Sequence, residues 1–177
     1  MPPPRYLPEV PLPPAAYLPG RTPRPGPAEA PPPVEPARWQ HSRAYLRGLD
    51  LFNHGYYWEA HEAWEGLWHA AGRRGPTADF LKGLIKLAAA GVKVREGRPD
   101  GVVSHARRAA ELFGQVAAAL GAEAAHHLGL AFCDLLAFSC AAEGRAPAAR
   151  PDEAPGPRVV FDFVLRPAAA LTPPSAP

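Results

Sequence analysis

The chain has 177 residues, of which 25 are proline, and its 19 basic and 17 acidic residues nearly balance. That length suits one domain and is short for two. The basic residues are not clustered as they are in nucleic-acid-binding proteins. The apolar runs end well before the roughly 18 residues that a membrane span needs. We therefore expect neither nucleic acid nor a membrane as a partner.

Proline divides the chain into three parts. Fifteen prolines lie in residues 1–36 and eight in residues 146–177, whereas the segment 37–145 holds only Pro76 and Pro99. Because proline lacks an N–H and its ring clashes with the preceding helical turn, only the middle segment is free to be helical. We expect an all-α single bundle of about five helices in 37–145, between a proline-rich extended arm at 1–36 and a proline-rich tail at 146–177.

Apolar residues at helical spacing, separated by turn residues, place the helices within the middle segment. Gly55 suits a left-handed turn after the first helix, Thr77 is the expected N-cap of the third, and Pro99 suits the first turn of the fourth. The five expected helices span residues 38–53, 56–70, 77–95, 99–120 and 123–142.

Both ends of the chain carry apolar residues that a purely disordered linker would not need. The tail holds a strand-like run at 159–165, and we expect this run and part of the N-terminal arm to lie extended over the bundle. Cys133 and Cys140 are seven residues apart in a helical pattern, so their α-carbons would be about 10 Å apart, too far for a disulfide. We expect both to be reduced core thiols, which with the lack of a secretory signal pattern indicates the cytoplasm.

The expected second helix is the most informative segment, because it holds three of the four tryptophans. At about 100° per residue, His61, Glu62, Glu65 and His69 form a polar arc beside the apolar one, with Trp58 among them. A half-buried histidine that binds a carboxylate in a packed helix is the ordinary interpretation of this pattern. A polar pocket for a small molecule and a metal site are the alternatives.

The string His61-Glu62-x-x-Glu65 is close to metal-binding helix motifs but differs from the known ones. A zinc metalloprotease needs a second histidine where this chain has Glu65, and di-iron bundles need Glu-x-x-His pairs from two helices. No motif for a catalytic nucleophile or a phosphate-binding loop occurs. A divalent-metal site formed by His61, Glu65 and His69 is therefore kept as an alternative, and no cofactor is expected.

The third and fourth helices supply further candidate residues. Apolar side chains cover most of the third helix, which predicts a central position, and its lysines form a narrow polar strip that is either solvated or lines a cleft. If the protein is an enzyme, His61 held by a carboxylate, with Glu62 as its candidate partner, would act as a general base near neutral pH. The expected polar small-molecule pocket consists of Trp58, His61, Glu62, Glu65, Trp68, Lys82 and His105.

Several of these residues belong to a recognisable string. It runs Leu51-Phe52-Asn53-x-Gly55-x-Tyr57-x-Glu59-Ala60-His61-Glu62, then Glu65 and Trp68, and continues with Phe80-Leu81-Lys82-Gly83-Leu84-Ile85-Lys86-Leu87-Ala88-Ala89-Ala90 and a Gly97…Gly101 stretch. The string resembles the prokaryotic family catalogued as domain of unknown function 309. The resemblance implies a small helical bundle and implies no mechanism.

An interaction module is the competing class of function. The segment 51–70 is similar to a tetratricopeptide hairpin, with Gly55 at the turn followed by Tyr57 and Ala60. No 34-residue period recurs, so a solenoid is not expected. A protein partner that contacts this hairpin or the proline-rich arms is thus an alternative to a small-molecule ligand. The oligomeric state is left open by the sequence.

Overall fold

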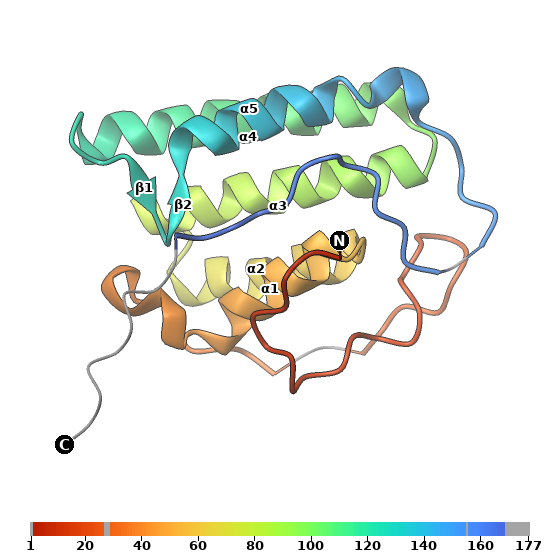
Figure 1. Ribbon diagram of the computed structural model, residues 1–177, viewed down its shortest axis with the longest axis horizontal. Coiled ribbons are helices and arrows are strands. Elements are labelled where there is room, and N and C mark those ends of the chain that lie inside the picture. The colour runs from red at the N-terminus through yellow and green to blue at the C-terminus, as the bar shows by residue number, and fades with distance from the viewer. Residues whose placement is uncertain (1, 27–28, 155, 169–177) are drawn as a thin grey trace.

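The helices of this chain pack around one central member, α3. The computed structural model describes residues 2–26, 29–154 and 156–168. Figure 1 shows α3 lying between the layer of α1 and α2 and the layer of α4 and α5. The predicted all-α bundle of about five helices is confirmed. Within the described residues the α-helices are α1 Arg43–Asn53, α2 Tyr57–Ala70, α3 Pro76–Arg95, α4 Pro99–Leu120 and α5 Phe132–Glu143.

Helix α3 is buried on almost every side because most of its residues are apolar or small. Between Phe80 and Arg95, every position is buried except 82, 86, 89 and 93, which follow one another at helical spacing. Two glycines allow its neighbours to approach closely. A Cβ at Gly83 would lie 2.5 Å from the ring of Phe113 on α4, and one at Gly91 would lie 2.6 Å from the ring of Tyr57 on α2.

The start of the first helix differs from the prediction of one helix over 38–53. A 3-10 helix at Pro36–His41 precedes α1, and Ser42 separates the two. The Ser42 side chain accepts a hydrogen bond from the Tyr45 N–H, which caps α1 at its N-terminus. Likewise the third helix begins at Pro76 with Gly75 as its cap, so the expected capping by Thr77 was wrong. Proline at N1 removes an N–H that would otherwise lack a partner.

The predicted fifth helix over 123–142 was wrong in its first part. A two-stranded antiparallel hairpin, β1 His126–His127 and β2 Leu130–Ala131, takes up the residues before α5. The two residues of its turn, Leu128 and Gly129, both have positive φ, of 47° and 79°. A two-residue turn of this kind matches the twist of a hairpin and is incompatible with a continuing helix.

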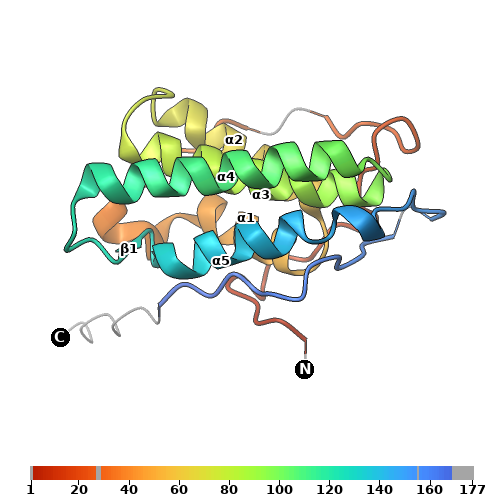
Figure 2. The same cartoon turned by 90° about the horizontal axis from the view of Figure 1, so that it is seen from above.

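The cysteines of α5 are free, as predicted, but the expectation that they are core thiols was wrong. Cys133 and Cys140 are both exposed. The buried stripe of α5 consists of Phe132, Leu135, Ser139 and Ala142, so both cysteines lie on other faces of the helix. Figure 2 shows α5 at one side of the bundle, beside the C-terminal tail and away from α2.

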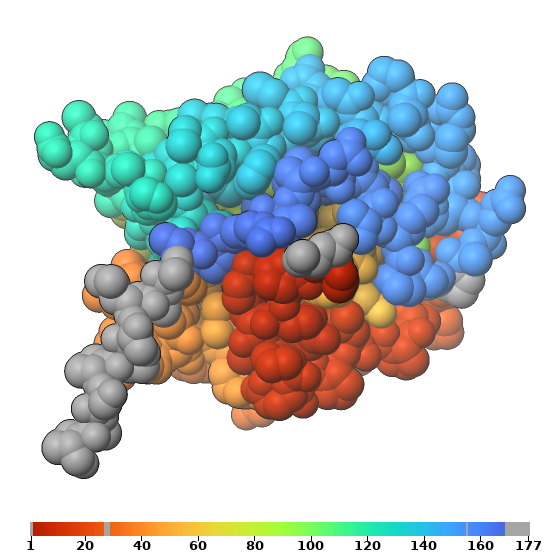
Figure 3. Space-filling view, in the orientation of Figure 1, coloured from red at the N-terminus to blue at the C-terminus, as the bar shows by residue number. Residues whose placement is uncertain are grey.

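The N-terminal segment packs against the bundle in irregular form, and a buried carboxylate holds it there. Asp50, at the end of α1, is fully buried and accepts hydrogen bonds from the N–H groups of Tyr6 at 2.7 Å and Leu7 at 3.0 Å. The Arg5 guanidinium adds an ion pair at 3.1 Å. Further along, Ala16, Leu18 and Val34 are buried against the core. Figure 3 shows this segment, in red, on the face that the tail also crosses.

The tail crosses the bundle as an extended chain without a partner strand. The Asn53 side chain makes the two backbone hydrogen bonds that a neighbouring strand would make. Its Oδ1 accepts from the Leu165 N–H and its Nδ2 donates to the Leu165 carbonyl, each at 2.9 Å. The Tyr57 hydroxyl accepts from the Val160 N–H at 3.0 Å. The strand-like run 159–165 is therefore extended but forms no strand, and its apolar side chains Val160, Phe161 and Leu165 are buried.

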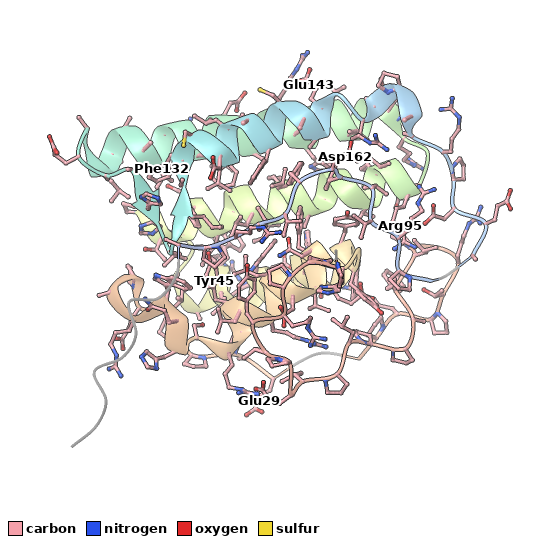
Figure 4. All side chains as sticks on the ribbon, in the orientation of Figure 1. Glu29, Tyr45, Arg95, Phe132, Glu143 and Asp162 are labelled. Atoms are coloured by element: carbon pink, nitrogen blue, oxygen red, sulfur yellow. The ribbon has the colours of Figure 1, made fainter. Side chains whose placement is uncertain are left out.

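A buried ion pair ties the tail to the end of α3. Arg95 and Asp152 are both almost fully buried, and the Arg95 Nε lies 2.5 Å from an Asp152 carboxylate oxygen. The same guanidinium donates to the carbonyl of Gly55 at 3.2 Å, and Arg158 contacts the second oxygen of Asp152 at 2.8 Å. Arg95 is labelled in Figure 4. No described helix is both long and apolar enough to cross a membrane.

We predict that Asp50→Ala loosens the N-terminal arm. The substitution removes the acceptor of three donors, two of them backbone N–H groups, and should lower the free energy of unfolding by about 2–4 kcal/mol. Urea denaturation measures this loss, and limited proteolysis should show new cleavage within residues 2–26. Glu9→Ala is the matched control, because Glu9 forms an exposed pair with Arg43. Equal losses in the two variants would contradict an anchoring role for Asp50.

Candidate functional site

Helix α2 presents its polar face beside the exposed strip of α3. It begins just after Gly55, whose positive φ of 82° turns the chain out of α1. Tyr57, Ala60, Trp64 and Leu67 form its buried face. The polar residues of the same two turns are therefore forced to the opposite and flanking faces, where they lie at the protein surface.

His61, Glu62 and Glu65 form a compact cluster on that surface. Each offers one ligand atom, and the three atoms all lie within 4.8 Å of one another. The His61 Nδ1 is 3.6 Å from Glu62 Oε1, which is longer than a hydrogen bond. That nitrogen is buried and has no hydrogen-bond partner among the described residues. The cluster thus brings together three potential ligand atoms, one of which lacks a partner.

The imidazole of His61 is held in its neutral form. Burial lowers its pKa below the usual value of 6.5, and the carboxylates of Glu65 and Glu62 only partly oppose this effect. The nearby charge of Lys86 lowers the pKa further. A neutral imidazole keeps a lone pair, so at pH 7 His61 can bind a metal ion or accept a proton.

His105 on α4 borders the same strip of α3 from the other side. Burial lowers its pKa, and the charges of Lys86, Lys93 and His61 lower it further. Lys86 therefore lies near both histidines, one from α2 and one from α4. The sequence placed Lys86 in the polar strip of the third helix but did not include it among the pocket residues. Lys86 follows Lys82, a predicted pocket residue, by four positions, and this helical spacing was the signal that could have added it to the pocket.

Trp68 and His69 interact with basic side chains at the end of α2. The Lys82 ammonium lies 5.5 Å from the centre of the Trp68 ring and the Arg73 guanidinium 5.4 Å from it. His69 accepts a hydrogen bond from Arg73 Nε at 3.0 Å. The compact trio contains Glu62 where the sequence suggested His69. His69 lies eight positions after His61, a rise of about 12 Å along a helix, which is too far for one ion.

Trp58 is covered by the N-terminal arm. Tyr17 packs on its ring with the centroids 4.3 Å apart, and the Arg24 guanidinium lies 5.8 Å from the ring centre. The Tyr17 N–H donates to Glu59 at 2.6 Å and fixes the arm at this point. Trp58 is therefore held by the arm, whereas the trio lies beside α3.

A cleft of about 490 Å³ adjoins the trio and shares Glu62 and Glu65 with it. Helix α1 contributes Arg47 to this cleft, and the N-terminal arm contributes its wall at Glu29 (Figure 4). Arg47 was not among the residues that the sequence suggested, because nothing in the sequence brings the arm and α1 beside α2. The lining residues are Glu29, Ala30, Pro31, Ala44, Arg47, Glu62, Ala63, Glu65, Gly66 and His69.

The fold and this cluster define an all-α helical-bundle protein with a polar site on its second α-helix. Residues 45–105 match the family described as domain of unknown function (DUF309), which confirms the resemblance seen in the sequence. This segment, which runs from within α1 to within α4, is similar to that family. It contains the trio, Trp58, Trp68, Lys82, Lys86 and His105. No curated protein and no solved structure matches the chain at a significant level.

We predict that acid destabilises the fold through its half-buried histidines. The pKa of His105 is lowered in the folded state, so the unfolded chain binds more protons below about pH 6.5. The free energy of unfolding should therefore be constant above that pH and fall as the pH drops toward the folded-state pKa. Denaturation between pH 7.5 and 5.5 should show a smaller loss for His105→Gln than for the wild type. His41→Gln, at an exposed position, is the control and should keep the full loss; an unchanged loss in His105→Gln would contradict the prediction.

Proposed function

We propose that this protein binds a divalent transition-metal ion through His61, Glu62 and Glu65. The observation that carries the proposal is the approach of three ligand atoms to within 4.8 Å of one another. Imidazole nitrogen and carboxylate oxygen are ordinary ligands of zinc, iron and manganese. The unpartnered, buried Nδ1 of His61 supports the proposal, because a buried polar atom normally has a partner.

The spacing of the ligand atoms favours a metal over a catalytic hydrogen bond. Ligands bound at about 2.1 Å in a tetrahedral site lie about 3.4 Å from one another. The His61 Nδ1 to Glu62 Oε1 distance of 3.6 Å is close to that value. A general base oriented by its carboxylate would instead need a hydrogen bond of about 2.6–3.2 Å. The base role of His61 with Glu62 is therefore the less favoured one.

The polar small-molecule pocket belongs to the same proposal. Three protein ligands leave at least one position of a four-coordinate ion for a ligand from solution. The 490 Å³ cleft that shares Glu62 and Glu65 offers room for the rest of such a molecule. An ion held here would supply Lewis acidity to a bound polar group.

A protein partner on the aromatic residues of α2 is supported less well. Trp64 is fully buried, and the chain's own Tyr17 and Arg24 cover Trp58. The arm thus already covers part of the aromatic surface of α2. The small-molecule site therefore takes precedence over the interaction module.

We predict that the protein binds about one equivalent of Zn²⁺ or Mn²⁺ and that Glu65→Gln weakens this binding by about 100-fold or more, because a lost ligand costs at least as much as a lost supporting contact. Isothermal titration of protein purified without a histidine tag or chelator measures the affinity. His61→Gln should have the same effect as Glu65→Gln.

His69→Gln is the matched control, because His69 lies on the same helix but outside the trio. Its affinity should equal that of the wild type. A wild-type protein that binds neither ion, or a His69→Gln variant as impaired as Glu65→Gln, would contradict the proposed site.

A further inference from the structure

The three lysines of α3 occupy the open strip of an otherwise buried helix. Lys82, Lys86 and Lys93 stand at three of the four positions between Phe80 and Arg95 that are not fully buried. Packing therefore confines the ammonium groups of α3 to one line between α2 and α4. His61, the histidine of the trio, lies near Lys86 from the side of α2, and His105 lies near Lys86 and Lys93 from the side of α4.

Two of the three lysines have a side-chain partner among the described residues, but only the partner of Lys93 is an anion. Lys93 forms an ion pair with Glu96 at 2.6 Å, and Lys82 lies over the Trp68 ring. Lys86 forms no ion pair or side-chain hydrogen bond with any residue that the structure describes. Its side chain is only partly exposed. A partly buried ammonium group without an anionic partner is unfavourable, so we expect Lys86 to bind an anion.

A metal ion in the trio increases this need. The carboxylates of Glu62 and Glu65 balance the two charges of the ion, and they are then no longer available to Lys86. The ammonium charges of Lys82 and Lys86 are left without counter-charges beside the site. An anion with two charges that reaches both the ion and the lysines would balance them.

We propose that Lys86, with Lys82 beside it, forms an oxyanion subsite that holds a phosphate group of the ligand against the bound metal ion. The proposal rests on the metal site proposed above and names the chemical class of its ligand. A phosphate monoester carries close to two negative charges at pH 7.5 and has several oxygens, so one oxygen can bind the metal while another accepts from Lys86. A carboxylate carries one charge and balances only one of the two lysines.

The test uses inorganic phosphate as the probe and the full chain loaded with Zn²⁺ or Mn²⁺, whichever binds. Isothermal titration should show phosphate binding to the wild type, and Lys86→Met should weaken it by about 10- to 100-fold, the value of a charge-assisted hydrogen bond. Lys86→Arg should restore most of the affinity. Acetate should bind to the wild type at least about tenfold more weakly than phosphate does.

Lys93→Met is the matched control, because it removes the same charge from the same strip at a lysine already paired with Glu96. It should bind phosphate as the wild type does. Metal affinity, measured on the same variants, separates the two proposals. Lys86→Met should bind the ion as tightly as the wild type or more tightly, since a repelling charge has been removed.

Three results of the phosphate and acetate titrations would overturn the subsite. The first is a wild type that binds the metal ion but not phosphate. The second is an equal loss of phosphate affinity in Lys86→Met and Lys93→Met. The third is acetate binding as tight as phosphate binding. Each leaves the metal site standing. Loss of metal binding in the wild type would instead overturn the proposed function itself. A short oligonucleotide that binds more tightly than phosphate would also contradict the subsite, because a phosphodiester carries only one charge per phosphate.

Discussion

Helix α3 packs between α2 and α4, and its apolar residues are buried on every side but one. A lysine inside that packing would have to give up its charge or find a buried anion, and both are costly. All three lysines of the helix therefore lie on the single open strip, and the residues of α2 and α4 that border the strip become their neighbours. The position of the polar site follows from the apolar packing of one helix.

The proline-rich ends complete the fold by using polar side chains of α1. Asp50 and Asn53 lie one turn apart, and both are buried. The first binds backbone N–H groups of the N-terminal arm, and the second binds both backbone groups of Leu165 in the tail. Proline prevents these two segments from forming helices. Some of their backbone N–H and carbonyl groups instead form hydrogen bonds with side chains of α1. The arm in turn supplies the wall of the cleft next to Glu62 and Glu65.

The helices and the polar face of α2 could be predicted because both follow from periodicity within one segment. His61, Glu62 and Glu65 are within four residues of each other, so helix geometry alone brings them together. The position of Lys86 near two histidines and that of Arg47 in the cleft could not be predicted in this way, since both depend on which helices pack side by side. The hairpin at Leu128 and Gly129 was missed because the apolar residues of 123–142 have helical spacing. The positive φ angles of these two residues, which end any helix there, are not visible in that spacing. The exposure of both cysteines has a similar cause, as the segment around them is rich in apolar residues while the packing buries another stripe of α5.

The account as a whole depends on a metal ion at the edge of the α3 strip, and diffraction locates such an ion directly. A crystal grown with Zn²⁺ and measured at the zinc absorption edge should show one strong anomalous peak among the side chains of His61, Glu62 and Glu65. A peak at the exposed thiols of α5 or at the β1 histidines, with none on α2, would contradict the account. So would the lack of any peak in a crystal that contains the ion.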